Sequence, residues 1–115
     1  METFLAAYIE CALWSSTHQD NDIALDSTHG PEGIARDTRN KMKSDCEKFL
    51  AAAAPYIGES EAESAGHDFW LTRNGHGCGF WDGDWGDRGD ALTEICEKFG
   101  EVNLLVGDDG FIHDY

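Results

Sequence analysis

The residues best suited to chemistry in this chain are the carboxylates of a glycine-rich segment, residues 82–90. Carboxylates alternating along such a segment could coordinate a hard cation such as Ca²⁺. The spacing does not fit the EF-hand pattern: counted from Asp82, the required sixth-position glycine is Asp87, and the twelfth position is Thr93. We therefore expect no metal here, and interpret the segment either as a solvated loop that ends in a helix-capping Asp90 or as an acidic patch facing a partner.

Three histidines and one cysteine form the other set of potential metal ligands: His67, His76, Cys78 and His113. The spacing His76-x-Cys78 is not that of the usual zinc knuckles, and Cys78 is expected to face the core. A zinc site is therefore the weaker interpretation, and a locally hydrogen-bonded turn residue is the stronger one for His76.

A cysteine nucleophile with a histidine base, such as Cys78 with His67, is the remaining catalytic option. No nucleophile elbow, phosphate-binding loop or dinucleotide fingerprint accompanies it. We expect a protein that is not an enzyme, with no catalytic residues and no cofactor.

Charge is the strongest compositional signal. The 115 residues carry 23 carboxylates against eight Lys and Arg, a formal net charge of −15. Such a field repels nucleic acids and anionic membranes and attracts basic protein surfaces. Trp70, Trp81 and Trp85 could stack on bases, but the neighbouring aspartates would repel phosphates. The predicted partner is a basic protein, and the alternative is general acidity that serves solubility at high salt.

Three acidic clusters are the candidate partner-binding residues, and a tryptophan beside carboxylates suits the aromatic anchor of a protein interface. The first cluster is the most favoured, and Trp85 is its anchor. The candidates are Asp82, Asp84, Asp87, Asp90 and Trp85, then Glu59, Glu61 and Glu63, and finally Asp20, Asp22 and Asp26.

Helices are predicted in the N-terminal part of the chain. Apolar residues at intervals of three and four predict a helix over residues 4–13, with Thr3 as a possible cap, and a second helix over residues 42–53. Residues 15–33 between them read as a long acidic loop. Pro55 suits the first turn of a following short helix that extends to Gly66.

Strands are predicted after that point. Residues 67–81 alternate around Asn74-Gly75, a strong hairpin signal, and residues 102–113 form a second hairpin around Asp109-Gly110. Between them, the apolar spacing over residues 92–99 predicts a helix capped by Asp90. The fold class is α+β: N-terminal helices packed with a C-terminal ββαββ antiparallel sheet, in one domain spanning 1–115, helical over 1–66 and sheet-containing over 67–115.

The four cysteines are scattered among apolar neighbours, with no CxxC pair: Cys11, Cys46, Cys78 and Cys96. Buried free thiols of a reducing compartment are the first interpretation, with disulfides or a metal as alternatives. The apolar run over residues 4–14 is too short and interrupted to span a bilayer, and the first three residues lack a basic leader. A cytoplasmic location is expected.

The run GHDFWLTRNGHG at residues 66–77, followed by GFWD at 79–82, FGEV at 99–102 and VGDDG at 106–110, resembles a family of small acidic proteins encoded by bacteriophages and prophages. Residues 9–16, IECALWSS, extend the resemblance over most of the chain. No catalytic residues come with it.

A phage origin would suggest a function for the high negative charge. Small acidic phage proteins include inhibitors that occupy the nucleic-acid groove of CRISPR effectors or restriction enzymes. The resemblance therefore implies an inhibitor that acts in the host bacterial cytoplasm by imitating phosphates. The alternative is a small structural or regulatory interaction module of the phage that binds through aromatic residues, without nucleic-acid mimicry.

Overall fold

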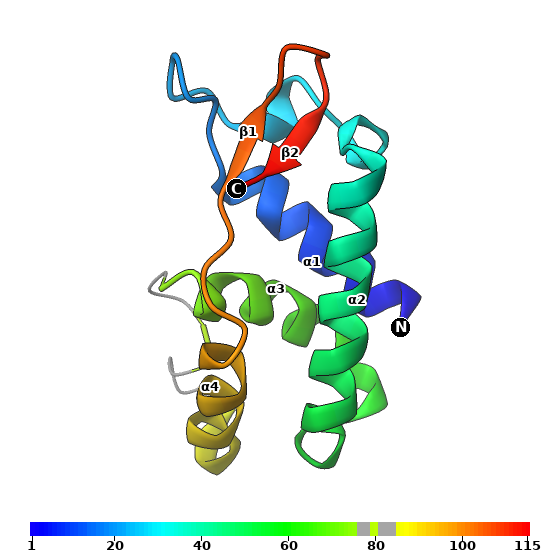
Figure 1. The fold of residues 1–115 in the computed structure, drawn as a ribbon. Coiled ribbons are helices and arrows are strands. Elements are labelled where there is room, and N and C mark those ends of the chain that lie inside the picture. The colour runs from blue at the N-terminus through cyan, green and yellow to red at the C-terminus, as the bar shows by residue number, and fades with distance from the viewer. Residues whose placement is uncertain (76–78, 81–84) are drawn as a thin grey trace.

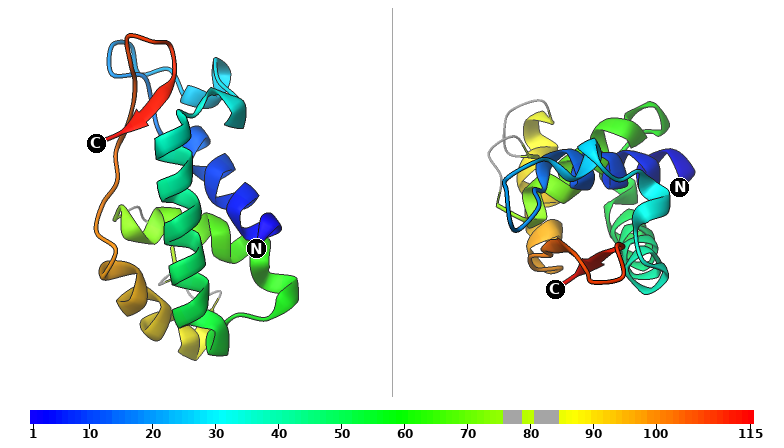
Figure 2. Two further views of the ribbon diagram at one scale, coloured as in Figure 1. Left: turned by 45° about the vertical axis from the view of Figure 1, so that its right-hand side comes forward. Right: turned by 90° about the horizontal axis from the view of Figure 1, so that it is seen from above.

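A computed structural model describes residues 1–75, 79–80 and 85–115. In these ranges the chain forms four α-helices followed by a β-hairpin (Figure 1): α1 (Glu2–Ser15), α2 (Arg36–Ala53), α3 (Ala62–Arg73), α4 (Gly89–Glu97), β1 (Leu104–Val106) and β2 (Ile112–Asp114). The molecule is elongated, 43 × 24 × 23 Å. The loop between α1 and α2 lies with the hairpin at one end, and α4 lies at the other (Figure 2).

Close contact between α1 and α3 forms the centre of the fold. A Cβ atom on Gly66 would fall on the carbonyl oxygen of Phe4 and 3.0 Å from the Cβ of Ala7, so only glycine fits this crossing. Rings from three helices stack beside it, and the centroids of Phe49 and Phe69 are 4.2 Å apart. The core is therefore an aromatic cluster shared by α1, α2 and α3.

The hairpin predicted over residues 67–81 is wrong in its first strand, because residues 67–73 belong to α3. One row of buried positions in this segment, Ala65, Phe69 and Arg73, has the four-residue spacing of a helix, although Trp70 and Thr72 are buried as well. Asn74 and Gly75 form a turn after the helix rather than the tip of a hairpin. Residues 76–78 and 81, which were assigned to the second strand, lie outside the described residues.

The second predicted hairpin is confirmed. Strands β1 and β2 pair antiparallel, with Leu105 opposite His113 and Val106 opposite Ile112. The α+β class is therefore confirmed, but in the ranges 1–75, 79–80 and 85–115 the sheet has two strands, so the ββαββ topology is not present there.

Both sides of this hairpin are covered. On the β1 side, the side-chain amide of Gln19 donates to Val106 O at 2.9 Å and accepts from Val106 N at 3.3 Å. On the β2 side, Ala35 N donates to Ile112 O at 2.8 Å. The loop that precedes α2 is thereby fastened to the C-terminal hairpin.

The helices predicted around residues 4–13 and 42–53 are confirmed as α1 and α2, but the predicted caps are wrong. Thr3 lies inside α1, which begins at Glu2. Asp90 lies in the first turn of α4, which has Arg88 at its N-cap and no side-chain capping bond. A carboxylate in the first turn still interacts favourably with the helix dipole.

Three segments differ in detail from the prediction. The loop over residues 15–33 contains two short 3₁₀ helices, Leu25–Ser27 and Pro31–Gly33. Pro55 lies in a 3₁₀ helix, Ala54–Tyr56. The short helix expected up to Gly66 is a 3₁₀ turn, Glu59–Glu61, that continues into α3 and ends seven residues later than predicted, at Arg73.

Cys11, Cys46 and Cys96 are buried free thiols, as predicted, and Cys78 lies outside the described residues. Among the residues that the structure describes, no helix combines the length and apolar character needed to cross a bilayer.

Candidate protein-binding surface

An acidic stripe runs along the exposed side of α4 and of the 3₁₀ turn before it, Gly86–Arg88. Its members are spaced by three, four and three residues, and all four are exposed: Asp87, Asp90, Glu94 and Glu97. We call this set the α4 acidic stripe. At a rise of 1.5 Å per residue, the stripe spans about 15 Å.

The opposite side of α4 fixes the helix to the core. Leu92 and Cys96 are fully buried, and Ile95 is partly buried against them. At the start of the helix, a Cβ on Gly89 would lie 2.5 Å from the carbonyl oxygen of Phe80, so glycine allows α4 to begin against that backbone. The stripe therefore stands on a helix whose position is set by packing.

Arg88 joins the α4 acidic stripe to a second predicted cluster, residues 59–63. Its guanidinium donates to both carboxylate oxygens of Glu61, at 2.7 and 3.0 Å, and to the carbonyl of Tyr56 at 3.0 Å. Glu59 and Glu63, two residues before and after Glu61 in the sequence, remain exposed. Two acidic segments that are distant in sequence thus lie next to each other.

Glu61 itself is engaged inside the protein. The hydrogen bond from Arg88 is the main cause that lowers the pKa of its carboxyl group, and a second bond from Gly58 N, at 2.9 Å, acts in the same direction. Among the candidates of this cluster, Glu59 and Glu63 are the carboxylates left facing solvent.

Trp85 does not have the exposure that an interface anchor requires. Only 4% of its surface is accessible, its indole Nε1 donates to the carboxylate of Asp68 at 2.6 Å, and its ring packs edge-on against Phe80 at 5.1 Å. Arg88 covers the ring, 5.0 Å from its centroid. Trp85 is buried beneath Arg88, whereas Trp14 is the exposed tryptophan among the residues that the structure describes, at 63%.

The third predicted cluster lies at the other end of the molecule from α4 (Figure 1). Asp20, Asp22 and Asp26 are all exposed on the loop between α1 and α2, and Asp22 has a positive φ of 60°. The structure therefore does not bring this cluster together with the other two. Asp82 and Asp84, the first two residues of the favoured cluster, lie outside the described residues.

Glu94 and Glu97 were missed by the sequence interpretation. The signal was present, because the apolar stripe of this helix was recognised and these glutamates occupy its complementary face.

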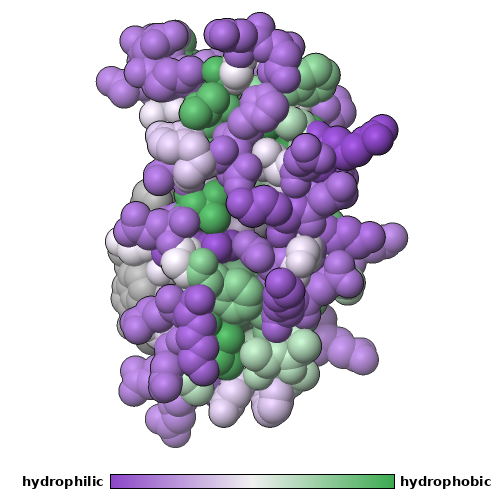
Figure 3. All heavy atoms as spheres, in the orientation of Figure 1, coloured by the Kyte–Doolittle hydropathy of each residue, from purple (hydrophilic) through white to green (hydrophobic). Residues whose placement is uncertain are grey.

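Hydrophilic residues cover most of the face of the molecule shown in Figure 3, with apolar residues in smaller patches among them.

Residues 66–75, part of the segment on which the predicted resemblance to phage proteins rests, contribute to the centre of the fold. The Arg73 side chain is 2% exposed and donates to Asp45 at 2.8 Å and to the Tyr8 hydroxyl at 3.0 Å. It also donates to the carbonyls of Phe99, at 3.1 Å, and Gly100, at 2.9 Å. Burial raises the pKa of Tyr8, so its hydroxyl stays protonated at neutral pH.

Neighbouring residues of the same segment are also structural. The Trp70 indole donates to Ser15 Oγ at 2.7 Å, and Thr72 Oγ1 accepts from Phe80 N at 2.9 Å. The Asn74 amide donates to Trp70 O and accepts from Val102 N, at 2.9 and 2.8 Å. Trp70, Thr72 and Asn74 therefore each form a hydrogen bond that stabilises the fold.

Comparison with known proteins found no match among family models, curated proteins or solved structures. The resemblance to phage proteins therefore stays a prediction.

The described thiols are poorly suited to nucleophilic chemistry. Burial raises the pKa of Cys11 to about 12 and raises those of Cys46 and Cys96 as well, so all three are protonated at neutral pH. The proposed pairing of His67 with Cys78 involves a residue outside the described ranges.

Two histidines of the zinc hypothesis, His67 and His113, have different carboxylate neighbours, and His76 and Cys78 lie outside the described residues. His67 lies 4.0 Å from Glu10, whereas His113 lies 3.0 Å from Asp109 in the C-terminal hairpin. Over residues 1–75, 79–80 and 85–115, the structure forms no group of three or more potential ligands for a metal ion.

Proposed function

We propose that this chain is a non-enzymatic, phage-encoded inhibitor that mimics nucleic-acid phosphates. It would block the basic DNA- or RNA-binding site of a host defence complex, a CRISPR effector or a restriction enzyme, in the bacterial cytoplasm. The observation that carries the proposal is the α4 acidic stripe.

The charge density of the stripe is close to that of a nucleic-acid strand. Each strand of B-DNA carries one phosphate per roughly 3.4 Å of helix axis, so about four phosphates fall within 15 Å. The stripe has four carboxylates over the same length. The Lys and Arg residues of a groove that binds a phosphate backbone could therefore pair with the carboxylates of the stripe at a similar spacing.

Fixed geometry favours such a mimic. The stripe is anchored by the buried face of α4 and by the ion pair between Arg88 and Glu61, so little conformational freedom is lost on binding. Glu59 and Glu63 widen the acidic surface beyond one helix. Binding would depend strongly on salt, because exposed charges are screened within about 8 Å at physiological ionic strength.

The test is competition for nucleic acid on purified defence complexes. A panel of CRISPR effectors and restriction enzymes is bound to fluorescent target DNA or RNA, and anisotropy is followed while this protein is added at low and high salt. We expect displacement from at least one complex at low salt, and direct binding of this protein to that complex, measured without nucleic acid, should weaken at least tenfold when salt rises from about 50 to 200 mM.

Matched variants locate the surface. The stripe variant carries Asp87→Asn, Asp90→Asn, Glu94→Gln and Glu97→Gln; the control removes the same charge at the other end of the molecule through Asp20→Asn, Asp22→Asn, Asp26→Asn and Glu32→Gln. We expect the stripe variant to lose displacement and the control to keep it. Equal losses, or a loss confined to the control, would reject the α4 acidic stripe as the binding surface.

A second candidate function is an interaction module that binds through aromatic residues. The observation in its favour is the exposure of Trp14 by 63%, Phe111 by 46% and Tyr115 by 69%. An aromatic interface would persist at about 0.5 M salt, where charges are screened within a few ångströms. Retention of a bound partner at that salt, and its loss in Trp14→Ala, would favour this alternative.

A further inference from the structure

Two histidines meet at the end of the molecule where the loop between α1 and α2 lies with the C-terminal hairpin (Figure 2). His18 Nε2 lies 2.7 Å from the hydroxyl oxygen of Thr28, and His29 Nδ1 lies 2.8 Å from the same atom. The centroids of the two rings are 5.9 Å apart. Two imidazole nitrogens therefore converge on one oxygen.

The backbone of the loop holds both histidines in place. His18 N donates to the carbonyl of Ile23 at 2.8 Å, and His29 N donates to the carbonyl of Leu25 at 2.9 Å. Leu25 is fully buried, and its own N donates to the carbonyl of Ser16 at 2.9 Å. Because these bonds fix the segments that carry the two rings, their meeting is set by the fold of the loop.

The partners of His29 determine which of its ring nitrogens carries a proton. Nε2 lies 2.9 Å from the carbonyl oxygen of Gly110, which can only accept, so Nε2 is protonated. In the neutral ring Nδ1 then has a free lone pair, and this lone pair faces Thr28. A hydrogen bond from the far ring nitrogen to a backbone carbonyl is typical of histidines that bind metal ions.

The hydroxyl proton of Thr28 has two possible acceptors, His29 Nδ1 and the carbonyl oxygen of Leu25 at 3.4 Å. When the proton points to Leu25, the lone pairs of the hydroxyl oxygen face the two histidines. His18 Nδ1 forms no hydrogen bond to the described residues, so it can carry the His18 proton and leave Nε2 free. Three lone pairs, on two nitrogens and one oxygen, can thus face one point.

The distances fit a transition-metal ion at this point. Ligand atoms bound at about 2.1 Å and at right angles to each other lie about 3.0 Å apart. The two nitrogen–oxygen distances, 2.7 and 2.8 Å, are close to that spacing. A ring centroid lies about 3.2 Å from an ion bound to its nitrogen, so two rings on one ion are at most about 6.4 Å apart. The 5.9 Å separation of the centroids satisfies this limit.

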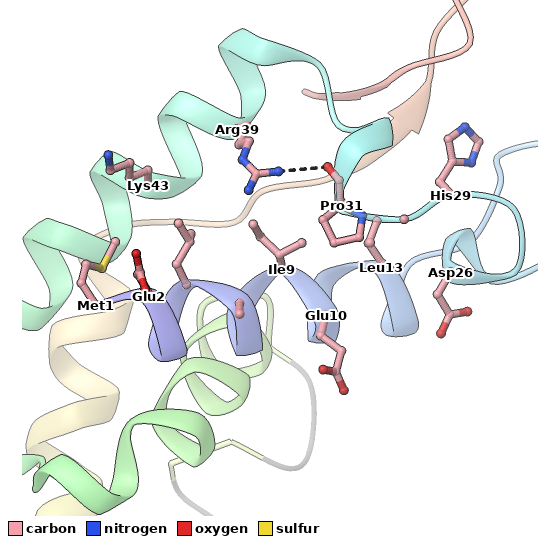
Figure 4. Close-up of a pocket in the computed structure, with 13 residues that line it drawn as sticks. Met1, Glu2, Ile9, Glu10, Leu13, Asp26, His29, Pro31, Arg39 and Lys43 are labelled. Atoms are coloured by element: carbon pink, nitrogen blue, oxygen red, sulfur yellow. Dashed lines mark hydrogen bonds between the residues drawn. The ribbon is translucent and has the colours of Figure 1, made fainter.

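The donor set favours particular ions. Imidazole nitrogens suit Ni²⁺, Cu²⁺ and Zn²⁺, whereas Mg²⁺ and Ca²⁺ prefer oxygen ligands. Asp26, on the same loop, points away from His29 in Figure 4, and the described part of the chain forms no group of three His, Cys, Asp or Glu ligands. Water would therefore fill the remaining positions. The net charge of −15 attracts any cation to the surface.

We infer that His18 Nε2 and His29 Nδ1 bind one divalent transition-metal ion of the Ni²⁺, Cu²⁺ and Zn²⁺ group, with Thr28 Oγ1 and water completing the coordination. The site uses none of the residues of the zinc hypothesis drawn from the sequence. Because His29 also bonds to Gly110, the ion would strengthen the link between the loop and the hairpin. The inference is independent of the proposed inhibitory function.

Zn²⁺ is the probe, added to the full chain in a large excess of Mg²⁺. A Cys78→Ser background removes one thiol that could bind Zn²⁺ elsewhere. Calorimetry is expected to show saturable one-to-one binding with a Kd below about 100 µM. In NMR spectra of the histidine rings, His18 Nε2 and His29 Nδ1 should shift on binding, and Mg²⁺ alone should shift neither.

Matched variants locate the ligands. His18→Gln and His29→Gln should each weaken Zn²⁺ binding at least tenfold, and the glutamine amide can still donate a hydrogen bond at either position. The controls His67→Gln and His113→Gln remove imidazoles outside the site and should change the Kd less than twofold. Saturating Zn²⁺ should raise the unfolding temperature of the controls but not of the two site variants.

Any of three results would overturn the inference. These are absence of saturable binding in excess Mg²⁺, ring shifts confined to other histidines, and a control variant that weakens binding as much as a site variant. Zn²⁺ that Mg²⁺ displaces would be an adventitious ion on carboxylates only, and this result would also reject the site. Thermal unfolding without metal confirms that each variant is folded before its binding is compared.

Discussion

The guanidinium of Arg73 and the carboxylate of Asp45 form a 2.8 Å ion pair that joins the end of α3 to the middle of α2. The Arg73 side chain is 2% exposed and the Asp45 side chain 25%, so the cation is buried and the anion reaches solvent. The pair is therefore asymmetric, and replacing Arg73 should lower the free energy of unfolding by a different amount from replacing Asp45.

Arg73→Leu should destabilise the protein by about 3 kcal/mol, the lower end for breaking a buried ion pair. The substitution leaves the Tyr8 hydroxyl and the carbonyls of Phe99 and Gly100 without their donor. Asp45→Asn should cost about 1 kcal/mol, because Arg73 keeps its other three acceptors. Urea unfolding measures both values.

Arg36→Leu, at an exposed arginine of α2, is the control for that comparison and should change stability by less than about 0.5 kcal/mol. If Asp45→Asn proved as costly as Arg73→Leu, the assignment of Arg73 as the centre of the network would be wrong.

Gly66→Ala should destabilise the fold by about 1–3 kcal/mol, the usual cost of overpacking. The new methyl group would meet the carbonyl of Phe4 and the side chain of Ala7, so α1 and α3 would have to separate. Ser64→Ala, on the exposed side of α3, is the matched control and should be neutral or slightly stabilising, because alanine has the higher helix propensity. Thermal unfolding of the two variants separates crowding from propensity.

The ion pair between Glu61 and Arg88 predicts a pH-dependent contribution to stability. Since the hydrogen bond from Arg88 holds the pKa of Glu61 below its usual value, the pair stabilises the fold above pH of about 4.3. This stabilisation is lost as pH falls through the lowered pKa of the folded state. The difference in unfolding free energy between wild type and Glu61→Gln should therefore be constant near neutral pH and shrink towards pH 3.

The neighbouring substitution Glu63→Gln removes the same charge from an exposed glutamate. For Glu63→Gln, the difference in unfolding free energy from wild type should not shrink towards pH 3 in the same way. An identical pH profile for both variants would contradict the role given to the Arg88 bond.

Cys11, Cys46 and Cys96 should not react with a thiol reagent such as DTNB while the protein is folded. Each is fully buried, and burial raises each pKa, so little thiolate is present or reachable at pH 8. A Cys78→Ser variant makes the measurement unambiguous: no thiol should react in buffer, and three should react in denaturant. Rapid reaction of the folded variant would show that one of these sites opens easily.

The sequence predicted α2 and the second hairpin because, in each, the apolar residues recur at one regular spacing that matches a single buried face. It failed at α3 because that helix is buried on several sides: Phe69, Trp70 and Thr72 all contact the interior, so the apolar pattern loses its helical period. The Asn74-Gly75 signal then favoured a hairpin, although these residues follow a helix.

For the candidate surface, spacing alone could have identified Glu94 and Glu97. The neighbouring position of residues 59–63 could not have been foreseen, because it depends on the contact of Arg88 with Glu61 across 27 positions of sequence. The burial of Trp85 is likewise set by Asp68 and Phe80 and not by its acidic neighbours in the sequence.

The amide of Gln19 has a consequence for self-association. By bonding to both N and O of Val106, it occupies the position where an additional strand would pair with β1. Ala35 holds the corresponding position beside Ile112. A short hairpin with open edges is a template for intermolecular sheet growth, and here both edges are already capped within the same molecule. Replacing a single glutamine would expose one of them to aggregation.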